Sequence, residues 1–235
     1  MLTKSEQQYY QQYPLSHPAY NVIRIAGRRI KESAIKYFSG KLLEIGCGTK
    51  AKSLLIREYV TEHIGLDHEE CPHGKTKIDI IGSAYQIPEK NDSFNCILST
   101  AVLEHLEEPQ KALTEAFRVL KPGGYAIYTA PLFWHIHEAP RDFFRYTSYG
   151  LKHLFKNAGF EIIEIKAMSG FWNTFITEFN YYLQRFKKGI FSPLVDLIVA
   201  LNNLTFAKLD IGKLRDENFT WMYIVVVRKP DKHHE

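Results

Sequence analysis

The chain has 235 residues, enough for one domain with a full-sized hydrophobic core, and its hydrophobic content of 45% is ordinary for a globular protein. Its formal net charge of +4 permits contact with anionic lipids, nucleic acids or phosphorylated substrates but requires none of them. Cys47, Cys71 and Cys96 are scattered without a C-x-x-C pair, so we predict reduced thiols, with neither a disulfide framework nor a metal site.

Residues 1–39 are expected to form a helical extension ahead of the sheet-forming part of the chain. The opening segment, MLTKSEQQYYQQYP, lacks the apolar core of a signal peptide, so we predict a cytoplasmic location. A basic helical stretch, RIAGRRIKESAIKYF, follows the tyrosine-rich opening.

From residue 41 onward, short apolar strands alternate with helical patterns. We predict helices at 51–60, 109–120 (closed by the stop signal KPGG) and 148–160. The predicted strands are 41–48, 63–67, 77–84, 93–102, 125–133, 161–169 and 220–229.

The alternation of strands and helices predicts an α/β fold of the three-layer, Rossmann-like type, with helices on both faces of a seven-stranded sheet. The sheet should be mostly parallel, because helices connect most of its strands. No regular crossover helix joins the last two strands, so we expect an antiparallel pair at the edge and an antiparallel last strand. We expect residues 1–235 to form a single domain, in which residues 172–218 are a long aromatic insertion.

A turn with two glycines, Gly46 and Gly48, follows the first strand and lets the backbone approach a ligand closely. Nineteen residues after Gly48, Asp67 ends the second strand, where an acid can accept hydrogen bonds from both hydroxyls of a ribose. At this point NAD and other adenosine cofactors are equal candidates.

Glu44 helps to separate these candidates. It lies two residues before Gly46, where a carboxylate would repel a pyrophosphate but would favour a sulfonium and an α-amino group. The alternative is that Glu44 only caps a backbone group or pairs with a nearby lysine.

The ordered set LLEIGCGT, GLD and IGSAYQIPEKNDSFNCILSTAVLEHLEEPQKALTEAFRVLKPGGYAIYTAP closely resembles the class I S-adenosylmethionine-dependent methyltransferases over about residues 40–170. The resemblance implies their three-layer methyltransferase fold and S-adenosylmethionine (SAM) as cofactor. It also implies roles for particular residues: Glu44, Gly46, Cys47 and Gly48 at the methionine end, Asp67 on the ribose, Ser83 and Ala84 beside the adenine, Ser99, Thr100 and Ala101 under the cofactor, and His105 nearby.

Two residues depart from the family pattern. Lys50 stands where the family often has a third glycine, which predicts a tighter or differently shaped turn. Ser83 replaces the usual aspartate, which should weaken the contact with the adenine amine. The fourth strand ends in STAV in place of [DN]-P-P-[YF], which argues against methylation of the exocyclic amines of nucleic-acid bases, and we expect no nucleic-acid partner.

The segment after the fifth strand, PLFWHIHEAPRDFFRYT, is expected to face the methyl donor, because ligands of this fold meet at the carboxyl ends of the strands. It resembles an H-x-x-P-x-D-x-x-R-Y-[ST] element of a methyltransferase branch associated with glycan and surface-polysaccharide pathways, and the matching residues are His137, Pro140, Asp142, Arg145, Tyr146 and Thr147.

His137 titrates in the useful range and is the first candidate for a general base, with Asp142 or Glu138 orienting it. The catalytic candidates are therefore His137, Asp142 and Arg145. Asp142 and Arg145 are equally well spaced for a structural ion pair, and Thr147 or Ser148 for a helix cap. His135 is expected to be a packing residue.

The aromatic insertion contains Pro193, Asp196, Asn202 and Asn203 in its most apolar window, which argues against a membrane-spanning helix. We expect a helical lid over the substrate, with peripheral membrane contact through residues 172–209 as a second use of the same surface. The expected function is methyl transfer from SAM to a hydroxyl of a small molecule, sugar or lipid-linked glycan. The alternatives are an NAD-linked oxidoreductase and a non-catalytic SAM-binding module, and the sequence identifies no protein partner.

Overall fold

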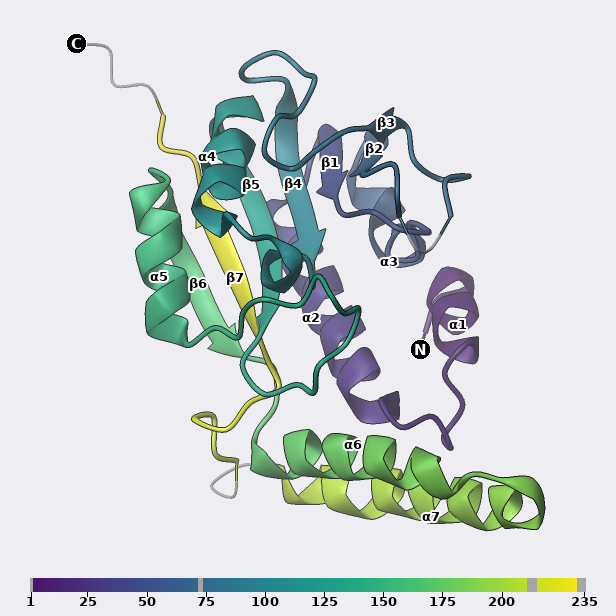
Figure 1. The fold of residues 1–235 in the computed structure, drawn as a ribbon. Helices are drawn as coiled ribbons and strands as arrows, with labels where there is room; N and C mark the ends of the chain where they lie inside the picture. Colours follow the sequence, from purple (N-terminus) through teal and green to yellow (C-terminus); the bar gives the residue numbers. More distant parts are fainter. Residues whose placement is uncertain (1, 72–73, 211–214, 232–235) are drawn as a thin grey trace.

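In the computed structural model, which describes residues 2–71, 74–210 and 215–231, helices cover both faces of a seven-stranded sheet (Figure 1). The strand order is β3-β2-β1-β4-β5-β7-β6, and β7 runs antiparallel to both of its neighbours while the remaining pairs are parallel. The predicted α/β fold, with its mostly parallel sheet and antiparallel last strand, is confirmed.

Two of the differences in length from the predicted strands change the sheet most. The third strand shrinks to two residues, because the Asp79 carboxylate, instead of a backbone carbonyl, accepts from the Gly65 N–H of the neighbouring strand at 2.6 Å. The KPGG segment lies within the fifth strand, where it bulges out: Phe94 pairs with Leu120, but Cys96 pairs with Tyr125. The strands are β1 (Lys41–Ile45), β2 (Glu62–Asp67), β3 (Ile80–Ile81), β4 (Phe94–Thr100), β5 (Leu120–Pro131), β6 (Glu161–Ala167) and β7 (Met222–Arg228).

Helices α1 to α3 lie on one face of the sheet, and α4 and α5 lie on the other (Figure 1). The predicted helix at 51–60 is shorter than expected, because α3 spans only four residues before a 3₁₀ turn at Arg57–Tyr59. The helices are α1 (Lys4–Gln11), α2 (Tyr20–Tyr37), α3 (Ser53–Ile56), α4 (Pro109–Val119), α5 (Ser148–Asn157), α6 (Phe171–Leu183) and α7 (Ser192–Thr205).

Side chains of successive residues in the central strands point alternately into two separate hydrophobic cores, one on each face of the sheet. Leu43 of β1 faces the core beneath α4 and α5, whereas its neighbour Leu42 faces the core beneath α2. Both are fully buried, and burial of each such side chain contributes roughly 1.5–3 kcal/mol. Burial on both faces explains why these strands are continuously apolar.

Helices α6 and α7 form a hairpin, residues 171–209, that lies beyond the carboxyl ends of the parallel strands (Figure 1). Asn21 at the start of α2 anchors it by donating to the Asn203 carbonyl of α7 at 2.9 Å. Within the described ranges, no helix is both long and apolar enough to cross a bilayer.

Candidate functional site

The glycine turn after β1 is tied to the neighbouring strand. The N–H groups of Gly46 and Cys47 both donate to the Leu66 carbonyl of β2, at 2.9 and 3.1 Å. Gly46 and Gly48 have φ values of +69° and +50°, the left-handed region that suits glycine. A side chain at Gly46 would also collide with Val102, which follows β4. The turn is therefore a bare stretch of backbone at the carboxyl edge of the sheet.

Gly46→Ala is expected to destabilise the protein by about 2–5 kcal/mol, because left-handed strain adds to the clash with Val102. Urea unfolding measures this loss. Gly189→Ala is the matched control: Gly189 has a φ of +51° but no atom within 4 Å of its built Cβ, so strain alone of about 1–2 kcal/mol should appear. Equal losses in the two variants would contradict the assigned clash.

Lys50 stands where the family often has a third glycine, and its φ of +53° lies in the left-handed region that suits glycine. The tighter or differently shaped turn stays a prediction. The Lys50 ammonium donates to the His63 carbonyl at 3.0 Å and forms an ion pair with Asp79. The aliphatic part of the side chain passes over Gly65, where a Cβ would meet it. These contacts hold Lys50 in the strained conformation.

Asp67 is buried at the end of β2, and each of its carboxylate oxygens accepts one backbone hydrogen bond. Oδ2 accepts from Gly48 N and Oδ1 from His68 N, both at 2.8 Å. A carboxylate has about four lone-pair sites, so two remain for the hydroxyls of a ribose. The predicted ribose-binding residue therefore both fixes the glycine turn and keeps acceptor capacity for a ligand.

Glu44 is almost completely buried and lies 2.8 Å from His63 Nε2, measured from its Oε2. Its partner is therefore a histidine of β2 and not the lysine that the sequence alternative named. Glu44 and His63 share one face of the sheet because Glu44 pairs in register with Gly65, two residues after His63. The role of Glu44 at the methionine end of the cofactor stays a prediction.

The predicted adenine-side and floor residues gather at the same edge of the sheet. Ser83 Oγ accepts from Tyr85 N at 3.1 Å, and Ala84 packs against the core beneath α4 and α5. Ser99 is buried in β4, Thr100 ends that strand, and Ala101 has a φ of +53°. The Ala101 N–H donates to the carbonyl and hydroxyl of Thr129, which fixes this strained residue between β4 and β5.

These residues fit SAM. The bare glycine backbone, the spare acceptor sites of Asp67 and the strained Ala101 lie together at the carboxyl ends of β1, β2 and β4, where α/β folds bind nucleotides. Cys47, also in the turn, is buried, and burial raises the pKa of its thiol to about 12, so it remains protonated at neutral pH.

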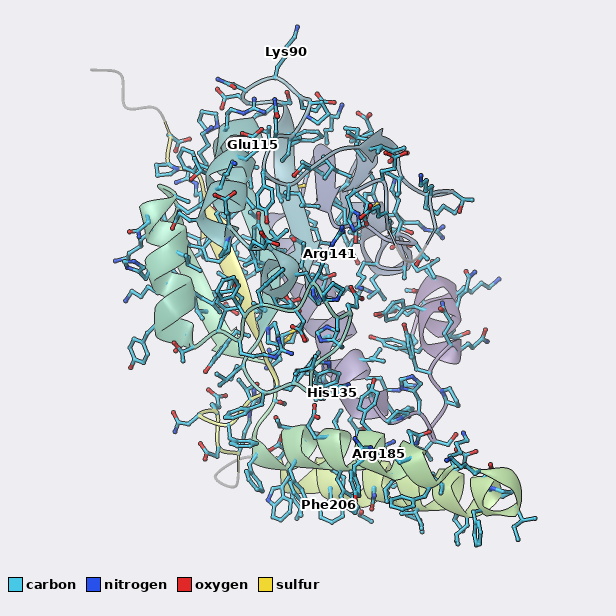
Figure 2. The ribbon with its side chains drawn as sticks, viewed as in Figure 1. Lys90, Glu115, His135, Arg141, Arg185 and Phe206 are labelled. Carbon is cyan, nitrogen blue, oxygen red and sulfur yellow. The ribbon has the colours of Figure 1, made fainter. Side chains whose placement is uncertain are left out.

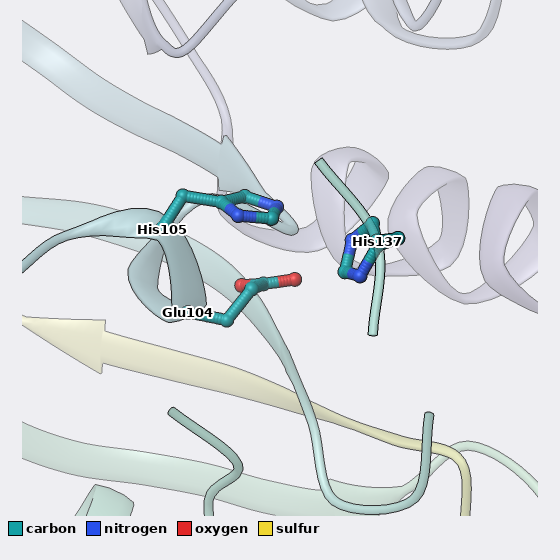
Figure 3. A group of neighbouring side chains, drawn as sticks. All are labelled: Glu104, His105 and His137. Atoms are coloured by element: carbon teal, nitrogen blue, oxygen red, sulfur yellow. The ribbon is translucent and has the colours of Figure 1, made fainter. Parts of the chain in front are cut away.

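Next to this edge, Glu104, His105 and His137 form a cluster (Figure 3). Glu104 and His105 belong to a 3₁₀ turn after β4, and His137 comes from the loop after β5. The ring centroids of His105 and His137 lie 4.7 Å apart, and the Glu104 carboxylate points between the two rings (Figure 3). His105 and His137 were among the predicted site residues, but Glu104 was not. Its only signal in the sequence is an acid inside the L-E-H segment.

The Glu104 carboxylate is fully buried, and within the described residues neither of its oxygens has a hydrogen-bond partner. Burial raises the pKa of Glu104 to about 8, so it is mostly protonated at neutral pH. Burial and the nearby His105 lower the pKa of His137, so this imidazole is neutral and can accept a proton. One ligand atom from each member of the cluster lies within 4.8 Å of the others, a set that could also hold a divalent cation.

Asp142 and Arg145 form a bidentate ion pair at 2.6 and 2.9 Å that shapes the loop after β5. The Asp142 Oδ2 also accepts from the His137 backbone N–H at 2.8 Å and lies 3.4 Å from His137 Nδ1. The Arg145 guanidinium holds the pKa of Asp142 well below its usual range. Thr147 caps α5 by accepting from Gly150 N, as predicted. Asp142 and Arg145 thus position His137, and direct catalytic roles for them stay predictions.

The same loop reaches across to β2 and to the hairpin. Arg141 contacts His68, next to Asp67, and forms an ion pair with Glu70. His135 stacks on its neighbour Trp134 and lies 3.0 Å from Glu178 of α6, but it is exposed, so it is not a buried packing residue. Figure 2 shows Arg141 in the middle of the molecule and His135 closer to α6. The loop therefore bridges the cofactor-binding edge and the hairpin.

Comparison with known proteins places these features in one family. A family model described as a methyltransferase domain matches residues 21–165, more than half of the chain. A probable SAM-dependent methyltransferase of Mycolicibacterium smegmatis is 32% identical over 96 residues, 38% of this chain and 37% of that protein. The 2-methyl-6-phytyl-1,4-hydroquinone methyltransferase 1 of Oryza sativa is 26% identical over 164 residues, 60% of this chain and 47% of that protein.

The alignments thus span less than half the length of these two curated relatives. The crystal structure of a putative sarcosine dimethylglycine methyltransferase from Galdieria sulphuraria superposes with a TM-score of 0.58 at 19% identity, over 91% of this chain and 85% of that one, which supports the fold. The family match decides against the NAD-linked alternative. The chain belongs to the family of S-adenosylmethionine-dependent methyltransferase domains.

Proposed function

We propose that the chain transfers a methyl group from SAM to a hydroxyl oxygen of an acceptor that is a small molecule, a sugar or a lipid-linked glycan. The observation that carries this proposal is the partly buried His137 beside the cofactor-binding edge, whose Nδ1 faces the Asp142 carboxylate at 3.4 Å, which leaves Nε2 as the atom that takes the proton. A hydroxyl must lose a proton to become a good nucleophile, whereas a carboxylate or a neutral amine needs no such help.

Bound SAM would supply the methyl group as an electrophile on a sulfonium. His137 accepts the proton of the acceptor hydroxyl, and the electron pair of the O–H bond stays on the oxygen. This oxygen would form the new bond to the methyl carbon while the carbon–sulfur bond breaks with its electron pair on sulfur, so that the demethylated cofactor leaves. Asp142, 3.4 Å from His137 Nδ1, stabilises the resulting imidazolium. Arg145 holds Asp142 in place and prevents it from taking the proton itself. Positioning of the two reactants contributes up to ~7–11 kcal/mol, and the base adds about 3–5 kcal/mol.

The acceptor is expected beside the loop after β5, with α6 on its outer side. Glu178 and Tyr181 of α6 contact His135, so the hairpin borders the loop that carries the base. One relative is named for a phytyl-bearing hydroquinone, whose ring carries two hydroxyls and an apolar phytyl tail. Its name is compatible with a lipid-like acceptor.

A panel assay tests this function. The protein is incubated with ¹³C-methyl SAM and quinols, sugars or lipid-linked glycans, and the demethylated cofactor and the labelled product are measured. We expect turnover with a hydroxyl acceptor and a ¹³C–O bond in the product. Methyl transfer only to amines or carbon would contradict the proposal. Tight cofactor binding without turnover on any acceptor would favour the non-catalytic module.

A further inference from the structure

The α6–α7 hairpin exposes apolar side chains and buries several polar ones, unlike a helix pair whose outer side faces water. Its buried positions carry amides and hydroxyls beside only three apolar side chains (Ile176, Val195 and Val199), whereas its exposed positions carry many rings and branched apolar chains. The buried polar residues are Asn173, Thr174, Thr177, Asn180 and Asn203. The exposed apolar residues, which we call the outer face, are Phe175, Phe179, Tyr182, Phe186, Ile190, Phe191, Leu194, Leu197, Ile198, Leu201, Leu204 and Leu209.

Amide hydrogen bonds fix this orientation. Asn180 of α6 donates to the Asn203 side chain at 3.2 Å and accepts from Asn202 at 2.9 Å, which joins the two helices. Asn203 also donates to the backbone carbonyls of Leu15 and His17, at 2.8 and 3.0 Å. Turning the outer face inward would bury these polar groups without partners or break their bonds. The hairpin therefore keeps its apolar side outward.

The outer face is continuous along both helices. Phe171, Phe175 and Phe179 stack at four-residue intervals on α6, with interplanar angles of 4° and 7°. On α7 the exposed leucines recur at 194, 197, 201 and 204, which places them on one stripe. Contiguous apolar surface of this kind marks an interaction site on a protein.

The tip of the hairpin is basic and apolar at once. Arg185, Lys187 and Lys188 lie beside the exposed Phe186 and the turn that follows, in which Ile190 is 87% exposed. The acids of the hairpin are already engaged, because Asp196 pairs with Lys187 and Glu178 with His135. Figure 2 shows Arg185 on this part of the molecule. Cations beside exposed rings match the headgroup region of an anionic bilayer.

We propose that the hairpin docks on an anionic membrane surface, with its outer face in the headgroup–acyl boundary and its basic tip among the phosphates. This inference goes beyond the proposed function and does not depend on it. The charge complementarity of the tip points to a bilayer as the occupant. In this position the apolar side chains of the outer face would contact acyl chains in place of water, and no helix would need to span the bilayer.

Vesicle flotation with the full chain tests the proposal, using phosphatidylcholine vesicles with and without phosphatidylglycerol. The wild type should float with the anionic vesicles. The double variant Leu197→Glu, Leu201→Glu should lower the partition coefficient about a hundredfold, because two exposed leucines that would be immersed in the bilayer are lost. Arg185→Gln with Lys188→Gln should lower it roughly thirtyfold on anionic vesicles and leave the residual binding to neutral vesicles unchanged.

Tyr149→Glu is the matched control, because Tyr149 is 83% exposed on α5, far along the chain from the hairpin, and should bind vesicles like the wild type. Thermal unfolding and S-adenosylhomocysteine affinity check that each variant is folded. The proposal is overturned if the wild type stays unbound at low salt, or if the leucine variant binds as well as the wild type. It is also overturned if sedimentation equilibrium shows a wild-type dimer that the leucine variant dissolves, since a second copy would then cover the outer face.

Discussion

Asp67→Asn is expected to weaken binding of SAM and S-adenosylhomocysteine by about a hundredfold to ten-thousandfold. The carboxylate accepts from the Gly48 and His68 N–H groups and keeps two lone-pair sites for the ribose. An asparagine has no charge, and its amide NH₂ would face one of these backbone donors. Two charge-assisted hydrogen bonds contribute roughly 3–6 kcal/mol, from which the range follows.

Isothermal titration calorimetry measures this loss directly. Asp196→Asn, in the hairpin and remote in sequence from the turn, is the control and should bind the cofactor like the wild type. If Asp67→Asn kept the wild-type affinity while remaining folded, the cofactor would have to bind elsewhere in the chain, and the assigned site would be wrong.

His137→Ala should lower kcat on a hydroxyl acceptor by about 10²–10⁴-fold and leave the affinity for S-adenosylhomocysteine unchanged. His137 lies in the loop after β5, outside the glycine turn and away in sequence from Asp67, so we expect only proton removal to be lost. His135→Ala is the matched control, because His135 stacks on Trp134 and pairs with Glu178 in the same loop. Full single-turnover activity of His137→Ala would remove His137 from the mechanism.

The pH profile gives a second readout of the same residue. Because burial lowers the pKa of His137 from its ordinary value of 6.5, the neutral form that accepts a proton persists below pH 6.5. We therefore expect kcat/KM to be level at neutral pH and to fall only in more acidic solution, with this acidic limb absent from the residual rate of His137→Ala. A limb above pH 7 would mean that a different group titrates.

The sheet and the cofactor turn could be predicted from the sequence because their signals are local. Apolar runs, the Gly46–Gly48 turn and an acid after the next strand lie within thirty residues of one another, and parallel strands bring their ends to one edge. The bulge at KPGG escaped prediction because a Pro-Gly-Gly stop and an irregular strand have the same residues. Only pairing with Phe94 and Cys96 of β4 distinguishes them.

Contacts between distant segments could not be predicted. The pairing of Glu44 with His63 depends on the register of β1 against β2, and the burial of Glu104 depends on a loop that begins nearly thirty residues later. The outward orientation of the apolar side of the hairpin depends even more on distant contacts. Its aromatic content is plain in the sequence, but which side faces outward is set by Asn203 and its bonds to Leu15 and His17 at the other end of the chain.

The passage of Lys50 over Gly65 to Asp79 has an evolutionary consequence. The three residues lie on separate segments but depend on one another. The Lys50 side chain fits only because Gly65 has no side chain, and its ammonium pairs with the Asp79 carboxylate. A homologue with glycine at position 50 would lack the ammonium that pairs with Asp79, while Cys47 would still crowd any side chain at position 65. Substitutions at positions 50 and 79 should therefore be correlated across an alignment, and a change of Lys50 alone would leave the Asp79 carboxylate without its ammonium partner.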